Sequence, residues 1–421
     1  MASDAAVNGG AQWSGPPIAV IGIGADGWSG LGEAAREAVS DAEVVFGSAR
    51  QLELIPQDVA VARREWPSPL VPALPSLFAD HTGRRICVLA SGDPMFYGIG
   101  VTLARLFGAD HLRVFPQASS ASLACARLGW ALAETPVVSA VGRPVESVLP
   151  ELADRRRVLV LSADEHTPGQ LAELLRDNGF GESALTVLEQ LGGPRERVVH
   201  DRATGWELAA GDPLNIVAID CVADPKHLRA TRVPGLADEL FGGDGQLTKS
   251  EVRALTLAAL APAPGELLWD VGGGSGSIAI EWCRTHPSCR AVSFERLEHR
   301  RRQIADNAAA LGVPYIGVFG EILTDVGKST ESPPPDAIFI GGGLTQDGVL
   351  ETCWSRLRQG GRLVANAVTA ESEALLLNWA AVHGGELRKF QIYRAEALGK
   401  FTTWRPQLPV AQWAVVKRGS V

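Results

Sequence analysis

The 421-residue sequence has no stretch of about 18 uncharged apolar residues, so it contains no predicted transmembrane helix. Its first residues, Met-Ala-Ser-Asp-Ala-Ala, lack the basic region and apolar core of a secretory signal. We therefore expect a soluble, cytoplasmic protein. Residues 1–17 are mostly small and polar, which predicts a loose N-terminal tail.

Cysteine is sparse and follows no regular spacing. The six cysteines are Cys87, Cys125, Cys221, Cys283, Cys289 and Cys353, and this scatter indicates a reducing compartment without a disulfide framework. Cys283, His286 and Cys289 lie close together, but no second Cys or His pair has zinc-finger spacing and H-E-x-x-H is absent. We interpret these cysteines as ordinary residues near a helix end, and we expect no metal site.

An excess of basic charge is also missing. The net charge is −9 and the isoelectric point is near 5.5, which disfavours DNA or RNA as the main substrate. No Ser-His-Asp or Cys-His arrangement is recognisable either, so no side chain is assigned as a catalytic residue from the sequence.

The chain does have ample apolar residues, at 46%, and enough length for two or three domains. Short apolar runs alternate with helical patterns, which predicts two α/β halves with mainly parallel sheets. Strands are expected at residues 18–23, 43–47, 85–90, 158–161, 184–188 and 215–220, and then at 267–271, 291–295, 315–319, 337–340 and 362–366. Helical stretches are expected at 121–128 and 169–177.

A loss of periodicity over residues 223–245, with several Pro and Gly turn signals, predicts a linker between domains 18–222 and 246–421. Thr248 and Glu251 have the spacing of a capping box, which predicts a capped helix beginning there.

The most informative segment is a predicted strand that ends in an acid and a glycine turn, Leu268-Leu-Trp-Asp-Val-Gly-Gly-Gly-Ser-Gly-Ser277. Gly272, Gly274 and Gly276 alternate after Asp270, whereas a dinucleotide fingerprint would need glycine at position 277. Glu295 ends the next predicted strand, where an acid can accept hydrogen bonds from both ribose hydroxyls of a nucleoside.

The first half of the chain also has a glycine turn, which matches a dinucleotide-binding fingerprint only in part. Gly22, Gly24 and Gly27 match G-x-G-x-x-G after a predicted strand. The following strand should end in an acid for the ribose, but it continues Gly47-Ser-Ala-Arg50. The dinucleotide interpretation is therefore disfavoured. A stronger feature is the loop Ser91-Gly-Asp-Pro-Met-Phe-Tyr-Gly-Ile-Gly100, which is suited to exposing backbone groups to a ligand.

The first half resembles the tetrapyrrole methylases, a class of S-adenosylmethionine (SAM) methyltransferases that bind SAM between two α/β lobes. The resemblance rests on the early I-G-I-G turn, the Ser91–Gly100 loop, Phe115-Pro-Gln-Ala-Ser-Ser120 and Leu188-Glu-Gln-Leu-Gly-Gly-Pro194. It implies a cofactor site formed by Gly24, Ala25, Ser91, Gly92, Asp93, Phe96, Ser119, Ser120, Ala163 and Leu191. Many members of that class have proline where Ala25 stands.

The second half resembles the class I SAM methyltransferases, and among them the decarboxylating corrin methyltransferases. Residues 245–253, the glycine turn, Ile338-Phe-Ile-Gly-Gly-Gly343 and Gly360-Gly-Arg-Leu-Val-Ala-Asn366 carry the resemblance. It implies SAM contacts from Thr248, Asp270, Gly272, Gly273, Gly274, Ser275, Gly276, Glu295, Glu321 and Ile322. The family segment at the last site is usually Gly-Asp-Ala, whereas this chain has Gly320-Glu-Ile322.

The order of the two halves is similar to that of the fused, decarboxylating C5,15-methyltransferases of cobalamin synthesis. The resemblance implies conversion of precorrin-6Y to precorrin-8X, with C5 methylation by the first domain and C15 methylation and decarboxylation of the ring-C acetate by the second. It also implies two SAM per turnover and a homo-oligomer. The alternatives are the cobalt-containing equivalent of this step, a nucleic-acid methyltransferase, and a SAM or tetrapyrrole sensor without turnover.

Such a substrate carries many carboxylates, so arginines near the clefts are expected to hold its rim. Arg253 is our candidate for this role. Gly341, Gly342 and Gly343 would let a flat macrocycle lie against the backbone.

Overall fold

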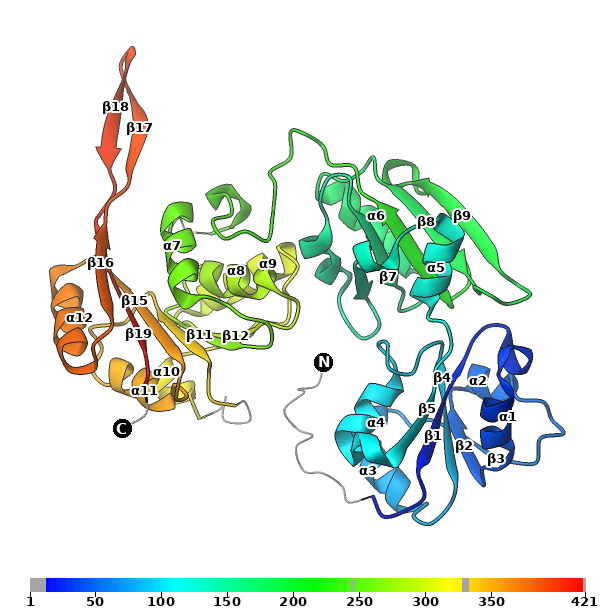
Figure 1. Cartoon of the computed structure of the whole chain (residues 1–421). Helices are drawn as coiled ribbons and strands as arrows, with labels where there is room; N and C mark the ends of the chain where they lie inside the picture. The colour runs from blue at the N-terminus through cyan, green and yellow to red at the C-terminus, as the bar shows by residue number, and fades with distance from the viewer. Residues whose placement is uncertain (1–12, 244, 246, 328–332, 419–421) are drawn as a thin grey trace. The chain divides into compact units, whose positions relative to one another are not determined.

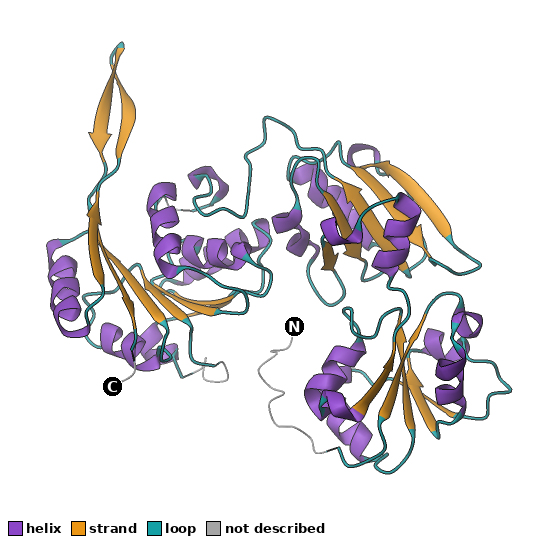
Figure 2. Cartoon of the chain, viewed as in Figure 1, coloured by secondary structure: helices purple, strands orange, loops and turns teal. Residues whose placement is uncertain are grey.

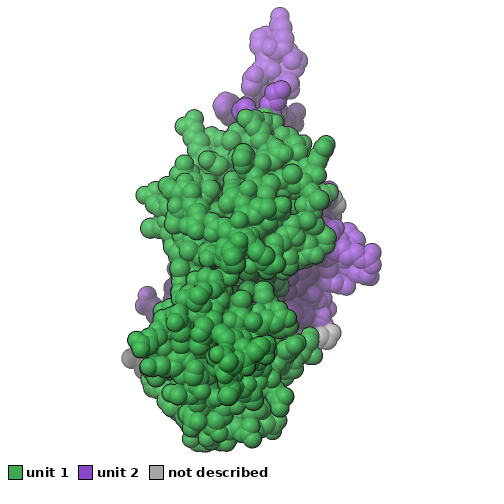
Figure 3. Space-filling model, turned by 90° about the vertical axis from the view of Figure 1, so that its right-hand side faces the viewer, with its two compact units in different colours: residues 1–145, 151–224 green, residues 146–150, 225–421 purple. Residues whose placement is uncertain are grey.

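A computed structural model describes residues 13–243, 245, 247–327 and 333–418 of the chain. The chain divides into two compact units, which are coloured separately in Figure 3. The first unit runs up to Val145 and resumes over Glu151–Asp224, and the second combines Glu146–Pro150 with the residues from Pro225 onward. None of the helices in the described part of the chain has the length and apolar character needed to cross a bilayer.

The first lobe of the first unit is a five-stranded sheet with strand order β3-β2-β4-β1-β5 and parallel pairing throughout. Its strands are β1 (Ile18–Ile23), β2 (Val44–Gly47), β3 (Ala62–Glu65), β4 (Ile86–Ser91) and β5 (Leu112–Phe115). Its helices are α1 (Glu33–Ser40), α2 (Ala49–Glu53), α3 (Leu70–Ala79) and α4 (Ile99–Phe107), with short 3-10 turns at Gly27–Gly30 and Ala109–His111.

Helices cover both faces of this sheet (Figure 2), and the alternation along β4 explains why. Ile86 and Val88 pack on one face with Phe78 of α3, in a cluster that also includes residues of α4. Cys87 and Leu89 pack on the other face, in a cluster that includes residues of α1 and α2. A strand that is buried on both faces must be apolar along its whole length, which is the pattern that predicted it.

The second lobe differs from the expected parallel sheet. Its order is β6-β7-β10-β8-β9, and only the β6–β7 pair is parallel. Strand β10 runs antiparallel to β7 and β8, and β9 runs antiparallel to β8. The strands are β6 (Val137–Ser139), β7 (Arg157–Leu161), β8 (Ala184–Glu189), β9 (Arg197–Arg202) and β10 (Asn215–Asp220). The helices are α5 (Ser120–Leu128) and α6 (Thr167–Asp177), with 3-10 turns at Leu132–Glu134, Val145–Glu151 and Ala203–Gly205.

The second unit contains a seven-stranded sheet of order β13-β12-β11-β14-β15-β19-β16. The strands are β11 (Leu267–Val271), β12 (Arg290–Phe294), β13 (Gly317–Phe319), β14 (Ala337–Ile340), β15 (Arg362–Ala367), β16 (Glu386–Phe390) and β19 (Val410–Val416). The helices are α7 (Ser250–Leu260), α8 (Ser277–Thr285), α9 (Glu298–Ala310), α10 (Ile322–Asp325), α11 (Val349–Arg356) and α12 (Ala370–His383). Strands β11 to β15 are parallel. Strands β12 and β13 lie on one side of β11, and β14 and β15 lie on the other, so the strand order reverses at β11. This reversal creates a topological switch point.

A two-stranded hairpin, β17 (Tyr393–Leu398) and β18 (Phe401–Pro406), extends beyond the end of β16 (Figure 1). Its two strands pair with each other and with no other strand of the described chain. The sequence had not predicted β16, the hairpin or β19.

The predicted linker 223–245 is not a free connection, because the chain from Pro225 onward is grouped with the second unit and part of it packs there. Leu236 and Phe241 belong to the core, and a 3-10 turn covers Asp238–Leu240. The predicted capping box is wrong, because α7 begins at Ser250 after Lys249 and has no side-chain cap. This segment is held instead by a hydrogen bond from the Arg253 side chain to the Thr248 carbonyl oxygen.

Candidate cofactor-binding sites

The first unit has a cavity of about 100 Å³ where its two lobes meet. Because β1 and β4 are parallel neighbours, the loops that follow them lie at the same sheet edge, and both contribute to its wall. The lining residues are Ile23, Gly24, Ala25, Arg50, Ser91, Gly92, Ala118, Ser120, Leu123, Leu188, Leu191, Leu214, Asn215 and Ile216.

Six of the ten positions expected to hold SAM in this half line the cavity, namely Gly24, Ala25, Ser91, Gly92, Ser120 and Leu191. Asp93, Phe96, Ser119 and Ala163 do not. Asp93 accepts a hydrogen bond from the Met95 amide (2.8 Å), and Ser119 is the N-cap of α5, where its hydroxyl oxygen accepts from the Ser122 amide (3.1 Å). Those side chains therefore stabilise local turns of the backbone.

The loop after β8 closes tightly on the first glycine turn. A Cβ atom at Gly193 would lie 2.7 Å from both the Cβ and the carbonyl oxygen of Ala25. Real Cβ atoms do not approach other atoms so closely, so only glycine permits this contact between the two lobes. The Leu188–Pro194 motif thus brings Leu191 to the cavity wall.

Two polar residues of the cavity had not been predicted, Arg50 and Asn215. Arg50 follows β2, and its Nη2 donates to Ser91 Oγ (2.8 Å). Asn215 begins β10, and its Oδ1 accepts from Ser162 Oγ (2.6 Å). The only sequence signal was at Arg50, which stands near the position where a dinucleotide-binding fold would have its acid.

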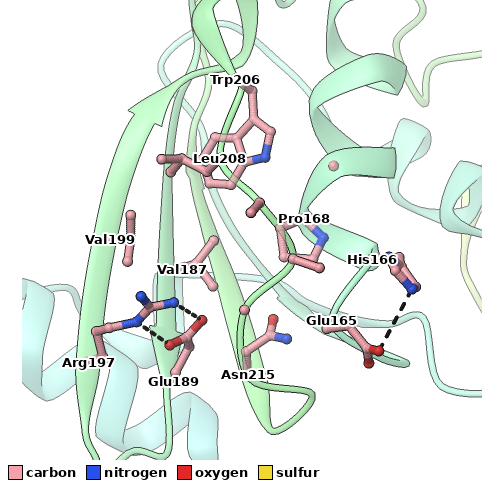
Figure 4. Close-up of a pocket in the computed structure, with 14 residues that line it drawn as sticks. Glu165, His166, Pro168, Val187, Glu189, Arg197, Val199, Trp206, Leu208 and Asn215 are labelled. Carbon is pink, nitrogen blue, oxygen red and sulfur yellow. Dashed lines mark hydrogen bonds and ion pairs between the residues drawn. The ribbon is translucent and has the colours of Figure 1, made fainter.

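A second cavity, of about 310 Å³, lies in the second lobe and shares Asn215 with the first (Figure 4). Its apolar wall includes Val187, Val199 and Trp206. Arg197 donates two hydrogen bonds to Glu189 (2.6 and 2.9 Å), which holds the pKa of that buried carboxyl below its usual range. None of the predicted site residues lines this cavity.

In the second unit, Asp270 lies at the switch point near the end of β11. It is buried, and its Oδ2 has no hydrogen-bond partner among the described residues. Burial raises the pKa of Asp270 to about 7, and the negative charge of Glu295 acts in the same direction. An unpaired buried carboxylate oxygen is costly, so this position fits a ligand that brings a hydrogen-bond donor or a positive charge.

The glycine turn of the second unit packs directly on the loop after β14. Gly272 has φ +75°, and a Cβ atom there would lie 2.6 Å from the Gly342 nitrogen. Gly274 and Gly276 also have positive φ. The predicted cofactor turn and the predicted macrocycle loop Gly341–Gly343 are therefore neighbours, which leaves backbone without side chains at this edge of the sheet.

Glu295 is buried and orients the same turn. Its Oε2 accepts from the Gly274 amide (2.9 Å) and its Oε1 from the Leu297 amide (2.9 Å). A carboxylate can accept about four hydrogen bonds, so capacity remains for the hydroxyls of a ribose. Asp270 and Glu295 therefore lie at the same edge of the sheet, at the ends of the neighbouring parallel strands β11 and β12, as their spacing in the sequence predicted.

The other predicted contacts of this unit lie around the same turn or at the ends of neighbouring strands. Ser275 is buried and its carbonyl oxygen accepts from Asn307 Nδ2 (3.0 Å), and Gly273 lies within the turn. Glu321 follows β13, and its Oε1 accepts from Gln346 Nε2 (2.5 Å) in the loop after β14. Ile322 is buried beside it as the first residue of α10.

Arg253 is not available to a substrate, so that prediction is wrong. Its side chain is 0% exposed. It donates to Glu281 (2.7 Å), to Asp238 (2.8 Å) and to the carbonyl oxygens of Leu236 and Thr248. These bonds hold the segment before α7 against α8. The sequence could not reveal them because the acidic partners are remote along the chain.

Comparison with known families agrees with this two-part architecture. Residues 17–205 match the family described as tetrapyrrole (corrin/porphyrin) methylases, and residues 239–417 match the precorrin methyltransferase domain.

Two relatives that span nearly the whole chain, and one that spans less than half of it, are similar to it. The precorrin-6Y C(5,15)-methyltransferase [decarboxylating] of Mycobacterium tuberculosis is 50% identical over 95% of this chain and 100% of its own length. The protein of that name from a Sinorhizobium species is 47% identical over 96% of this chain and 97% of its own. The cobalt-precorrin-7 C(5)-methyltransferase of Salmonella typhimurium is 32% identical over 43% of this chain and 88% of its own. The chain therefore belongs to the family of decarboxylating precorrin-6Y C(5,15)-methyltransferases.

Proposed function

We propose that this chain converts precorrin-6Y to precorrin-8X, by methylating C5 and C15 and removing CO₂ from the ring-C acetate. The observation that carries the proposal is that each unit has its own candidate cofactor site, a cavity in the first unit and, in the second, a glycine turn beside the unpaired buried carboxylate oxygen of Asp270. Each lies at the carboxyl edge of parallel strands, where ligands bind in open α/β sheets. The relatives that span the chain, and that bear the name of this reaction, support the proposal.

The first unit is the proposed site of C5 methylation, and the second that of C15 methylation and decarboxylation, with one SAM in each. SAM supplies an electrophilic methyl group, while the reduced macrocycle supplies the carbon nucleophile. The protein's task is then to position the two ligands and to exclude water. Gly272 and Gly342 allow close approach, and Asp270 and Glu295 offer acceptors to the polar end and the ribose of SAM. Asp93, Phe96, Ser119, Ala163 and Thr248 remain proposed contacts.

A cobalt-containing substrate is the second candidate. It is favoured by the relative named for cobalt-precorrin-7, which covers 43% of this chain. The relatives that span the whole chain are named for precorrin-6Y, which favours the cobalt-free route.

We also propose that the chain forms a homo-oligomer in the cytoplasm. Tyr393, Phe401 and Trp404 of the hairpin are more than half exposed, and an isolated two-stranded hairpin is marginally stable in water. Association through this hairpin would cover them. The double variant Phe401→Asp with Trp404→Asp should then lower the mass measured by light scattering. Val382→Asp, on an exposed position of α12, is the control.

The decisive experiment is a high-resolution mass spectrum of precorrin-6Y incubated with the protein and SAM. The expected product has gained two methyl groups and lost one CO₂. No change would contradict the cobalt-free route, and the cobalt-containing substrate would be tested next. If that also stayed unchanged while ligands bound, a sensor role would be favoured.

Substitution of one site separates the two activities. Gly274→Arg should fill the cofactor turn of the second unit, so that C15 methylation and decarboxylation are lost and C5 methylation remains. Gly265→Arg is a matched control, because Gly265 also has positive φ but has no atom within 4 Å of its Cβ position. Persistence of all three changes in Gly274→Arg would contradict the assignment.

A further inference from the structure

Arg50 presents unused hydrogen-bond donors to the cavity of the first unit. It lies in the first turn of α2 and lines the cavity together with Ser91. Its Nη2 donates to Ser91 Oγ (2.8 Å), and it makes no ion pair with any carboxylate in the described ranges. A guanidinium has five N–H donors in a planar fork, so most of its hydrogen-bonding capacity is free.

The charge of Arg50 is partly withdrawn from water. Burial lowers the pKa of Arg50, while the negative charge of Asp212 acts in the opposite direction. Both carboxylate oxygens of Asp212, however, already accept hydrogen bonds from Gln190 Nε2 (2.8 and 2.9 Å). A half-buried cation without a bonded anion is unfavourable, and an anionic ligand would relieve that cost.

Ser91 adds a second donor beside Arg50. Its Oγ accepts from Arg50 and also from Gln51 Nε2 (3.1 Å). Gln51 is buried and held in place, because its Oε1 accepts from the Ser48 amide (2.8 Å). Because Ser91 Oγ already accepts two hydrogen bonds, the hydroxyl group can act toward a ligand only as a donor. Arg50 and Ser91 therefore form a paired donor site at the cavity wall.

We propose that Arg50 and Ser91 bind a carboxylate of a ligand in this cavity. Guanidinium groups match the planar, two-oxygen geometry of a carboxylate, and hydrogen bonds between charged partners are about twice as strong as neutral ones. The inference rests on the proposed function, under which two ligands carry such a group. One source is the amino-acid end of SAM, and the other is an acetate or propionate side chain of the macrocycle.

The test uses the full chain in the Gly274→Arg background, so that the cofactor site of the first unit can be titrated by itself. Arg50→Met, Arg50→Lys and the control Arg64→Met, an exposed arginine of β3 in the same lobe, are compared. Isothermal titration measures the affinity for S-adenosylhomocysteine and for 5′-methylthioadenosine, which lacks the amino-acid end. The thermal unfolding midpoint reports whether each variant remains folded.

If the carboxylate comes from the cofactor, Arg50→Met should weaken S-adenosylhomocysteine about 10- to 100-fold and leave 5′-methylthioadenosine unchanged. Arg50→Lys should retain part of the affinity. If it comes from the substrate, S-adenosylhomocysteine affinity should stay constant, while the KM for precorrin-6Y rises by a similar factor with little change in kcat.

The proposal would be overturned if Arg50→Met remained folded and both its affinity for S-adenosylhomocysteine and its KM for precorrin-6Y stayed within about twofold of the control. A chain with wild-type Arg50 that bound neither ligand would contradict the proposed function itself, an outcome that the binding titration detects without any turnover.

Discussion

At the scale of single residues, Asp270 should give the second unit an unusual pH response. An unfolded aspartate has a pKa of about 4, whereas burial raises that of folded Asp270 to about 7. Between these values the folded chain binds more protons than the unfolded chain, so this residue makes stability fall as the pH rises from about 4 to 7. The expected loss is up to about 4 kcal/mol, because a tenfold change in proton affinity corresponds to about 1.4 kcal/mol.

Asp270→Asn removes this buried charge. We expect the variant to match the wild type near pH 4 and to be more stable by a few kcal/mol at pH 8, as measured by denaturant unfolding across that range. Its affinity for SAM should be lower, because the carboxylate oxygen offered to the ligand is lost. Equal pH profiles for the two proteins would show that Asp270 does not ionise in this window.

Gly272 should be intolerant of even the smallest side chain. Gly272→Ala places a Cβ 2.6 Å from the Gly342 nitrogen at φ +75°, whereas Gly265→Ala imposes a similar φ (+86°) in open space. The left-handed conformation costs each variant about 1–2 kcal/mol. Only Gly272→Ala should also displace the Gly341–Gly343 loop and weaken SAM binding at the second site. Similar binding affinities in the two variants would argue against a role for this contact.

At the scale of elements, the side chain of Arg253 links α7 to α8 and to residues 236–248, the segment that precedes α7. Glu281 of α8 also accepts from the amides of Gly235 and Leu236, so one buried carboxylate secures that segment together with the arginine. Removing one partner of a buried ion pair leaves the other charge uncompensated.

Arg253→Leu should therefore destabilise the second unit by about 3–5 kcal/mol. Arg302→Leu, which breaks an exposed pair with Glu298, should cost at most about 1 kcal/mol. Calorimetry of the two variants measures the difference, and limited proteolysis should cut residues 235–243 faster in Arg253→Leu. A small effect in both assays would mean that the core alone holds the segment.

The apolar runs predicted the buried strands closely, with β1, β11 and β14 found at the expected residues. Strand direction was not predictable in the second lobe, because the alternation of apolar residues carries no information about whether a neighbour is parallel. The hairpin was missed because its strands are rich in small and polar residues and expose most of their side chains. Burial of Arg253 depends on Asp238 and Glu281, which only the fold brings together.

The candidate sites were predictable where a motif requires a particular backbone, as at Gly272 and Glu295. They were not predictable where a side chain reaches a cavity from a neighbouring element. Arg50 and Asn215 come from α2 and β10, and their places at one wall depend on how the two lobes pack.

At the scale of the whole molecule, the two sites should work independently. Gly92→Val, at a position with φ +61° whose Cβ would meet the Ala118 carbonyl at 3.2 Å, should impair methylation by the first unit only. Mixed with Gly274→Arg, it should regenerate the product with two added methyl groups and one lost CO₂, as observed by mass spectrometry. Singly methylated product alone would indicate that the intermediate stays bound to one chain.

The final strand of each unit lies inside a sheet and not at its edge. Strand β10 lies between β7 and β8, and β19, with fully buried Trp413, lies between β15 and β16. During synthesis on the ribosome, neither of these sheets can be completed until its last strand has left the exit tunnel. The first unit can finish folding while much of the second unit is still to be made, whereas the second must wait for residues 410–416. Translation therefore imposes an order of assembly, in which the proposed C5 site forms before the C15 site.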